Sequence, residues 1–276
     1  MAEARSILIT GCSSGIGLAS AVMLKQRGWH VIATARREED LQRLRDEIGV
    51  DALHLELADA ASIAECATRT LEITDGRLLA LFNNAAYGQP GALEDLDGPA
   101  MRHQFDVNVI GNHDLTRRLI PAMRQNGRGR LVFCSSVLGL ISVPYRGAYC
   151  ASKFAIEALA DTLRLELAGS GISVSLIEPG PIETRFIDNA LEAARRHVDI
   201  EGSVHNAAYE AMLASMEHGG KKTFKLPAEA VARKLVHAVE SRRPKRRYYV
   251  TVPTYYIAVI RRILPTALID RIAKRH

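Results

Sequence analysis

The sequence predicts an α/β fold, a doubly wound Rossmann-type parallel sheet with helices on both faces. Short β-branched runs alternate with helix-length segments, as is typical of parallel sheets with crossover helices. A glycine-dense turn, TGCSSGIG at 10–17, directly follows the first apolar run. With 276 residues, 47% of them hydrophobic and 24% charged, the chain is long enough for a single domain with a sizeable core.

The predicted elements follow in order along the chain. Apolar runs predict strands at 7–10, 30–35, 52–57, 78–85, 129–136, 172–180 and 247–252. Helices are predicted over 16–27, 37–49, 62–74, 101–124, from about 149 onward, and over 227–240. Right-handed crossovers place these helices on both faces of the sheet. Residues 183–222 lack a strand, which predicts an insertion over the sheet edge.

Charge is unevenly distributed along the chain. The net charge is +5, yet the segment from 241 to 276 has ten basic residues against one acid, so the body before it is acidic. The N-terminus lacks the apolar core of a signal peptide, and no apolar run approaches the ~18–20 residues that span a bilayer. We therefore expect a cytoplasmic protein. The four cysteines have no metal-ligand spacing, so no metal site and no disulfide framework is predicted.

The glycine loop has glycines at positions 11, 15 and 17. A tight turn into a helix N-terminus brings backbone N–H groups close to a pyrophosphate. Ser13 and Ser14 add hydroxyls that can cap the helix or bind phosphate. The loop does not end in Gly-Lys-Ser/Thr, which argues against ATP or GTP. The alternative interpretation is a purely structural turn.

The end of the second strand indicates which dinucleotide would bind. NAD enzymes usually have a carboxylate there for the ribose hydroxyls, whereas this chain has Ala35 followed by Arg36 and Arg37. Guanidinium groups can bind a 2′-phosphate, so NADP(H) is favoured over NAD(H), with Arg36 the better candidate. The alternative is a solvated basic helix start.

The predicted catalytic group is Tyr149 with Lys153, four residues later on one helix face, and Ser136 at the end of the fifth predicted strand. A nearby ammonium favours the phenolate and lowers the tyrosine pKa, which makes proton exchange with a carbonyl or alcohol oxygen feasible. A lone Tyr-x-x-x-Lys pair is common by chance, but the glycine loop and the serine make a surface pair a poor explanation.

Over residues 5–253 the sequence resembles the short-chain dehydrogenases/reductases. The motifs that carry the resemblance are TGCSSGIG, NNAA at 83–86, Asn108, Ser136, YCASK and PGPIET at 179–184. The resemblance implies that Tyr149 is the acid–base and that Lys153 holds the nicotinamide ribose. It also implies that Ser136 orients the substrate oxygen and that Asn108 supports a water-linked proton relay.

The resemblance also implies a set of cofactor contacts. Together with the glycine loop and the two arginines, they are Gly11, Ser13, Ser14, Gly15, Ile16, Gly17, Arg36, Arg37, Glu56, Leu57, Asn83, Ala85, Tyr149, Lys153, Pro179, Gly180, Ile182 and Thr184. Two positions depart from the family pattern. Ala86 replaces the usual glycine of NNAG, and Glu56 replaces the usual aspartate at the adenine contact.

Within the family, the chain looks most like the 17β-hydroxysteroid and retinol dehydrogenases and the NADP-dependent aldehyde reductases, which handle lipophilic alcohols, ketones and aldehydes. The expected substrate-lining residues are Ser136, Leu138, Val143, Tyr145 and Phe186. No Arg or Lys is evident beside them for an acidic substrate group.

The leading hypothesis is therefore NADP(H)-dependent reduction of lipophilic aldehydes or ketones, with Tyr149 as the general acid. Oxidation of a hydroxysteroid or retinol-like alcohol is the alternative with the same chemistry. A non-catalytic NADP(H)-binding sensor or scaffold is the alternative from another class.

Three expectations concern domains and partners. Residues 1–253 form the catalytic domain, with 183–222 as a helical substrate lid, and 254–276 form a basic, apolar helical extension. The extension either packs against its own subunit or a partner, or lies peripherally on an anionic membrane surface. No motif supports nucleic-acid binding, and the small and apolar residues on several faces of the helix from 149 favour a homodimer or homotetramer.

Overall fold

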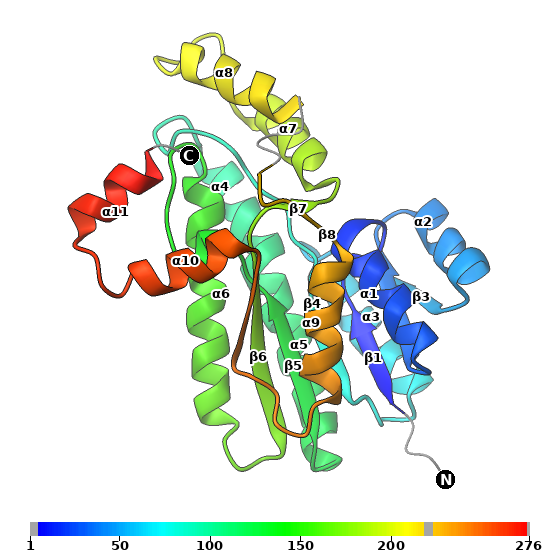
Figure 1. Cartoon of the computed structure of the whole chain (residues 1–276). Coiled ribbons are helices and arrows are strands. Elements are labelled where there is room, and N and C mark those ends of the chain that lie inside the picture. Colours follow the sequence, from blue (N-terminus) through cyan, green and yellow to red (C-terminus); the bar gives the residue numbers. More distant parts are fainter. Residues whose placement is uncertain (1–4, 218–222, 275–276) are drawn as a thin grey trace.

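The seven-stranded sheet is entirely parallel and confirms the predicted fold (Figure 1). The computed structural model describes residues 5–217 and 223–274. The strands are β1 (Ser6–Ile9), β2 (His30–Ala35), β3 (Asp51–His54), β4 (Ala80–Asn83), β5 (Gly129–Cys134), β6 (Ile172–Pro179) and β9 (Arg247–Val250). Their order is β3-β2-β1-β4-β5-β6-β9, so β2 and β3 lie on one side of β1, and the strands from β4 onward lie on its other side. In open α/β sheets, ligands bind at the carboxyl ends of the strands, next to the point where the strand order changes side.

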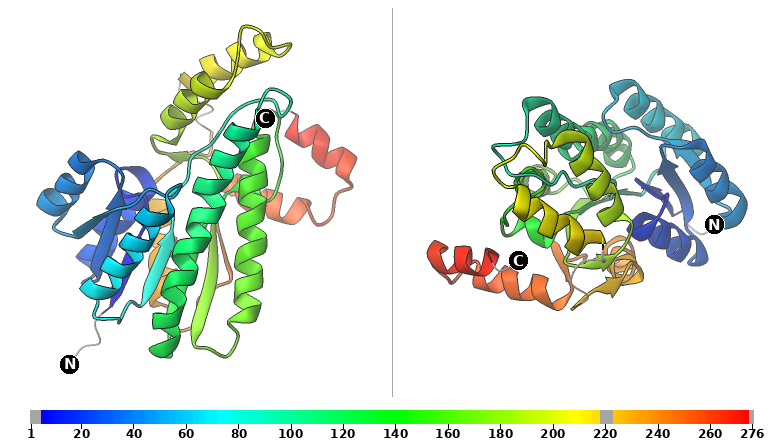
Figure 2. Two further views of the ribbon diagram at one scale, coloured as in Figure 1. Left: turned by 180° about the vertical axis from the view of Figure 1, so that it is seen from behind. Right: turned by 90° about the horizontal axis from the view of Figure 1, so that it is seen from above.

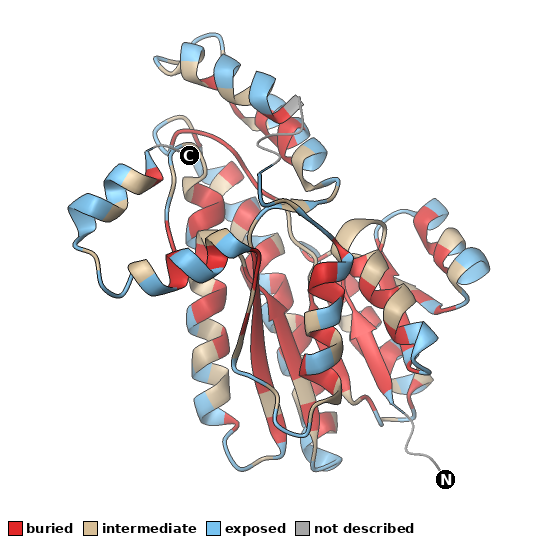
Figure 3. Cartoon of the chain, viewed as in Figure 1, coloured by how far each residue is buried: buried red, intermediate tan, exposed pale blue. Residues whose placement is uncertain are grey.

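Helices cover both faces of the sheet because successive side chains of a strand point to opposite sides. Ile7 and Ile9 belong to the core under one set of helices, and Leu8 belongs to the core under the other. The first set comprises α1 (Gly15–Gln26), α2 (Glu38–Arg43) and α9 (Glu229–Glu240). The second set comprises α3 (Ala60–Ile73), α5 (Gly111–Gln125) and α6 (Gly147–Glu166). Figure 2 shows the second set from behind, and Figure 3 shows the buried strands between the layers.

The predicted insertion consists of two helices that stand beyond the carboxyl edge of the sheet (Figure 1). They are α7 (Phe186–His197) and α8 (Asn206–Glu217). A small parallel ladder flanks them, formed by β7 (Ile182–Glu183) and β8 (Leu226–Pro227), which the sequence did not predict. Residues 218–222 of the expected lid lie outside the described residues.

The C-terminal extension packs on its own subunit through α10 (Val252–Ile260) and α11 (Thr266–Ala273). Ile257, Ala258 and Ala273 join Leu140 and Ile141, which follow the 3-10 turn η3 (Val137–Gly139), in one hydrophobic cluster. The helix α10 therefore straddles the boundary expected at 253/254. Within 5–217 and 223–274, no helix combines the length and apolarity that crossing a membrane requires.

Candidate active site

The glycine loop is shaped by its glycines. Gly11 and Gly15 have φ angles of +72° and +55°, which side chains rarely adopt. A Cβ on Gly17 would lie 2.1 Å from the Gly11 carbonyl oxygen. Because only glycine allows this closure, the loop backbone is held close against the first turn of α1. This arrangement fits a pyrophosphate at the helix N-terminus.

Two residues support this loop: Asn84, which lies in the NNAA motif but was assigned no role from the sequence, and Arg43, which the sequence did not single out. Asn84 Nδ2 donates to the carbonyl oxygens of Thr10 (2.8 Å) and Gly11 (3.2 Å). Arg43, from α2, donates to the Ser13 carbonyl at 2.5 Å. Ser14 occupies the N-cap of α1, but its side chain makes no capping hydrogen bond. Of the two roles expected for this hydroxyl, helix capping is therefore not used.

The two arginines after β2 differ in their partners. Arg37 is paired with the buried Asp40 at 3.0 Å. The Arg36 side chain is 70% exposed, and its ion pair with Glu56 is longer, at 3.7 Å. Glu56 is thus placed against Arg36, at the end of β3, where it balances the cation beside the expected adenosine site.

Of the other expected cofactor residues, Ala85 and Thr184 lie against the glycine loop, whereas Asn83 and Leu57 do not. Ala85 lies where a Cβ on Gly11 would touch it at 3.0 Å, and Thr184 stands similarly close to Gly15 at 2.9 Å. The side chains of Asn83 and Leu57 are buried in the core instead. Asn83 Nδ2 donates to Thr116 Oγ1 at 2.8 Å. These two positions can therefore offer a cofactor only their backbone.

The remaining expected cofactor residues lie at the ends of other elements. Pro179 ends β6, and Gly180 N donates to Val250 O. Ile16 lies in the first turn of α1, and Ile182 lies on β7.

The structure brings Ser136, Tyr149 and Lys153 together beside the end of β5. Ser136 is close enough to Tyr149 to lower the pKa of its phenol, and the Ser136 hydroxyl accepts from Leu138 N at 3.1 Å. The Lys153 ammonium lies 5.6 Å from the centroid of the Tyr149 ring. It donates to the Cys134 carbonyl at 2.8 Å, which fixes its position at the carboxyl end of the strand.

Burial dominates the ionisation of this group. The pKa of Tyr149 is raised, first by burial and then by Cys134, while Ser136 and the charge of Arg146 lower it. Burial lowers the pKa of Lys153, because it disfavours the ammonium. From the sequence we expected the lysine to lower the tyrosine pKa; in this structure desolvation outweighs nearby charge. The phenol therefore starts protonated at neutral pH.

Asn108 lies in a π-helical turn, η2 (Asp106–Ile110), inserted between α4 (Gly98–Phe105) and α5. Its amide contacts both backbone groups of Tyr87, accepting from N at 3.0 Å and donating to O at 2.9 Å. It also donates to Ser152 Oγ at 3.1 Å. Asn112 Nδ2 donates to the carbonyl oxygens of Val107 (3.2 Å) and Asn108 (3.0 Å) within the turn. Asn108 thus links the loop that follows β4 to α6, next to Tyr149.

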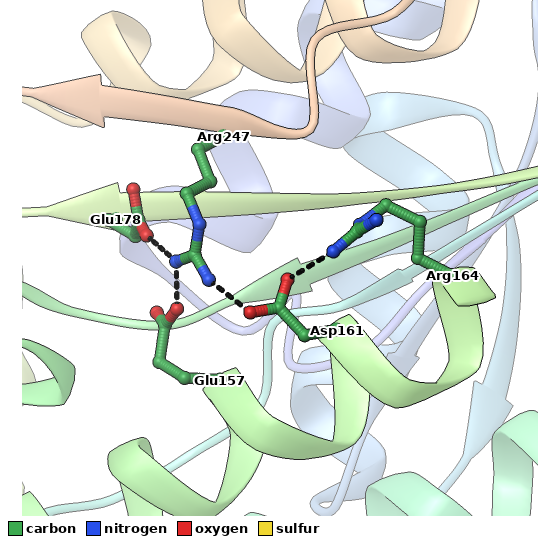
Figure 4. Close-up of polar contacts among 5 residues, drawn as sticks. All are labelled: Glu157, Asp161, Arg164, Glu178 and Arg247. Atoms are coloured by element: carbon green, nitrogen blue, oxygen red, sulfur yellow. Dashed lines mark hydrogen bonds and ion pairs between the residues drawn. The ribbon is translucent and has the colours of Figure 1, made fainter.

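A buried ion cluster anchors α6 to the sheet one turn beyond Lys153 (Figure 4). Arg247 on β9 bonds Glu178 on β6 at 2.5 Å, Asp161 on α6 at 2.6 Å, and Glu157 on α6. Burial, and after it the Glu157 charge, raise the pKa of Glu178 to about 8, while Arg247 lowers it.

The substrate side is apolar and nearly closed. The Tyr149 ring is 8% exposed, and the Phe186 ring at the start of α7 lies 5.3 Å from it. Leu138 and Val143 pack toward the C-terminal extension. Tyr145 packs with Tyr209 of α8.

Comparison with known proteins gives consistent matches. A family model described as short chain dehydrogenase matches residues 5–195. The chain is 44% identical over 268 residues to the "Uncharacterized oxidoreductase YbbO" of Escherichia coli K12, covering 97% of this chain and 93% of the relative. It is 34% identical over 259 residues to human 17-beta-hydroxysteroid dehydrogenase type 1, covering 89% and 77%. A short chain dehydrogenase/reductase from Burkholderia phymatum in complex with NAD matches with a TM-score of 0.79 and 28% identity, covering 95% of this chain and 94% of that one.

Proposed function

Because the chain belongs to the short-chain dehydrogenase family of oxidoreductases, we propose that it is an NADP(H)-dependent reductase of lipophilic aldehydes or ketones. The observation that carries the proposal is the buried Tyr149, whose pKa Ser136 lowers and whose ring centroid lies 5.6 Å from the Lys153 ammonium. The glycine loop, Arg36 and the segments at 83–86 and 179–184 would hold the cofactor. When bound, the nicotinamide supplies the hydride that the carbonyl carbon receives.

The chain's own residues would manage the proton. Ser136 holds the substrate oxygen at the phenol, and Tyr149 donates its proton to that oxygen as the alcohol forms. Lys153 stabilises the phenolate that remains, because its ammonium is fixed nearby by the Cys134 carbonyl. Asn108 keeps the Tyr87 segment in place against α6.

The ionisation of Tyr149 favours reduction over oxidation of an alcohol. A raised pKa keeps the phenol protonated, which is the form that a general acid needs. Alcohol oxidation would instead require the buried phenolate at the start of the reaction. Arg36 is the feature that supports NADP(H), because its side chain is exposed and no acid follows β2 directly.

The test is NADPH consumption with a panel of lipophilic aldehydes and ketones, comparing wild type with Tyr149→Phe. We expect turnover by wild type and a loss of about 10²–10⁴-fold in kcat for the variant, the typical contribution of a general acid. NADPH binding, followed by protein fluorescence, should persist in both. Binding without turnover of any carbonyl would instead support the sensor hypothesis, and a Tyr149→Phe variant of wild-type activity would remove the assigned acid.

We also propose that the outer face of the C-terminal extension contacts anionic membrane surfaces, as a second property of the same enzyme. Large apolar side chains are exposed there: Val252, Tyr255, Tyr256, Val259, Ile263 and Leu268. Exposed cations alternate with them at Arg261, Arg262, Arg271 and Lys274, a combination that suits an anionic lipid interface.

Flotation with vesicles tests this surface. Wild type should float with phosphatidylserine vesicles and not with phosphatidylcholine vesicles. The variant Val259→Glu/Ile263→Glu should stay unbound, because both side chains are exposed and their replacement leaves the buried side of α10 intact. Equal flotation of wild type and variant would contradict the membrane contact.

A further inference from the structure

Arg146 is the last residue before α6 and lies three residues before Tyr149. It occupies the N-cap position, and its carbonyl accepts from Cys150 N at 2.8 Å. A bridge between Gly91 and Arg146 fixes the backbone from the other side. From the sequence alone no cation was expected for an acidic substrate group, yet the Arg146 charge is close enough to Tyr149 to lower the pKa of its phenol.

This guanidinium has no anionic partner. Within 5–217 and 223–274 no carboxylate forms an ion pair with Arg146, and the hydrogen-bond acceptor that it meets is the Met216 thioether of α8, at 3.1 Å. The side chain is nonetheless partly buried, and this burial lowers the pKa of the guanidinium. Arg247, which also lies against α6, is satisfied by three carboxylates. A partly buried guanidinium without an anion carries a desolvation cost that no opposite charge offsets.

The backbone before Arg146 is strained. Tyr145 has a φ of +59°, in the left-handed region that a non-glycine residue seldom occupies. The conformation is held by contacts from the lid region: the Tyr145 ring lies 5.7 Å from Tyr209 and 5.6 Å from His205. Strained residues of this kind persist where the surroundings fix them, and they concentrate at ligand sites. Here the strain sets the direction in which the chain enters Arg146 and α6.

We propose that Arg146 binds a carboxylate of the substrate, so that the preferred substrates are oxo acids, aldehydes or ketones that also carry a carboxylate. This inference rests on the proposed reductase function. Tyr149 lies three positions after Arg146, a rise of about 4.5 Å along a helix axis, which places the carboxylate and the reacting carbonyl a few bonds apart. A single planar guanidinium matches the single charge and the two oxygens of a carboxylate. Phe186 and Met216 supply apolar contacts for the rest of the molecule.

A bound substrate of this kind would give Arg146 the anionic partner that the described part of the protein does not provide. The carboxylate would replace the thioether as the partner of Arg146 and offset the cost of its burial. Met216 belongs to α8, so the exchange of partners also involves the lid at the site. The Ser136–Tyr149 pair would then receive the carbonyl oxygen in a fixed register.

Matched substrates test the proposal. The ortho, meta and para isomers of formylbenzoate are compared with their methyl esters, for wild type, Arg146→Met and Arg146→Lys, with NADPH as cofactor. Wild type should prefer at least one acid to its ester. The ratio of kcat/KM between acid and ester should fall by about 10- to 100-fold in Arg146→Met, the scale of a hydrogen bond to a charged group. Arg146→Lys should retain part of the preference. The ratio is the readout because the charge of Arg146 also acts on Tyr149 and therefore on both substrates.

Arg185→Met is the matched control, because Arg185 precedes α7 near the same site but is exposed. It should keep the wild-type ratio. A ratio near one in wild type, or an equal ratio in wild type and Arg146→Met, would overturn the carboxylate subsite, and so would an equal fall in Arg185→Met. If Arg146→Met does not fold, competitive inhibition of wild type and Arg146→Lys by terephthalate, against its dimethyl ester, decides the matter. If wild type reduces neither acids nor esters nor any other carbonyl, the proposed function itself has failed.

Discussion

Arg36 is the residue whose surroundings best explain a choice between the two dinucleotides. Its side chain is 70% exposed and its contact with Glu56 is 3.7 Å long, so a 2′-phosphate can take over as partner at little cost. We expect Arg36→Ala to raise KM for NADPH by about 10-fold or more, since a charge-assisted hydrogen bond is lost. KM for NADH should change little, because NADH carries no phosphate there.

Arg37→Ala serves as the control for this experiment. Arg37 is engaged by Asp40 at 3.0 Å, so its removal should leave the ratio of the two KM values close to that of wild type. Steady-state kinetics with both cofactors and one carbonyl substrate measure the ratio. A wild-type enzyme that prefers NADH, or an Arg36→Ala variant with an unchanged ratio, would count against NADP(H).

At the scale of the element, regular structure could be predicted because the chemistry is local. The strands read as β-branched runs, and the sheet follows from their alternation with helices. The segment predicted as one helix over 101–124 is instead interrupted by η2, which contains Asn108; Asn112, at the start of α5, donates to the Asn108 carbonyl. Nothing in the apolar period of that segment marks the interruption, because side-chain amides bonded to the backbone stabilise it.

The site residues that belong to a motif could be predicted from the sequence. Those that only the packing of the fold brings to the site could not. Tyr149, Lys153 and Ser136 are recognisable by spacing. Arg146 is not, because a charged residue before a helix usually reads as solvated, and its enclosure depends on α8, some seventy residues later. Asn84 lies inside the NNAA motif, but its role could not be predicted, since its contacts with Thr10 and Gly11 depend on the pairing of β1 with β4.

The cluster that joins α6, β6 and β9 predicts a pH dependence of stability. The pKa of Glu178 is raised to about 8 in the folded protein, against ~4.3 for an unperturbed glutamate. Between these values the folded state binds a proton that the unfolded chain releases, so the stabilisation present at low pH is lost as pH rises through about 8. The groups that face it are Glu157, Asp161 and Arg247.

Glu178→Gln keeps the shape of the side chain and removes its titration. We expect the melting temperature of wild type to fall between about pH 5 and pH 8, and that of Glu178→Gln to fall less. Thermal unfolding followed by circular dichroism across this range gives the comparison. Asp161→Asn, on the exposed side of the same cluster, controls for the loss of one carboxylate. Parallel curves for wild type and Glu178→Gln would mean that Glu178 is ionised throughout.

At the scale of the molecule, the parallel sheet collects the site from distant parts of the chain. The glycine loop follows β1, Arg36 follows β2, and Ser136 follows β5, all at the same edge. The helices α7 and α8 stand over this edge, and α10 packs against the segment after Ser136 (Figure 1). We therefore expect substrate entry to be bounded by α7 and α8 on one side and by the C-terminal extension on the other. If the extension lies on a membrane, a lipophilic substrate can reach Tyr149 without crossing water.

The outward face of α6 predicts how copies of the chain associate. Its inner face carries Tyr149, Lys153 and Glu157, whereas Ala151, Ala158 and Leu165 are exposed at seven-residue intervals, with Leu165 67% exposed. A stripe of small and apolar residues on a twenty-residue helix suits packing against the same helix of a second copy, since a two-fold contact is self-complementary.

We expect a homodimer or homotetramer by light scattering. Ala158→Arg should reduce the mass of this assembly, because two long cations would meet at the two-fold axis. Thr68→Arg, on the exposed side of α3, should leave the assembly unchanged. A monomeric wild type, or an Ala158→Arg variant of unaltered mass, would show that α6 is not the contact.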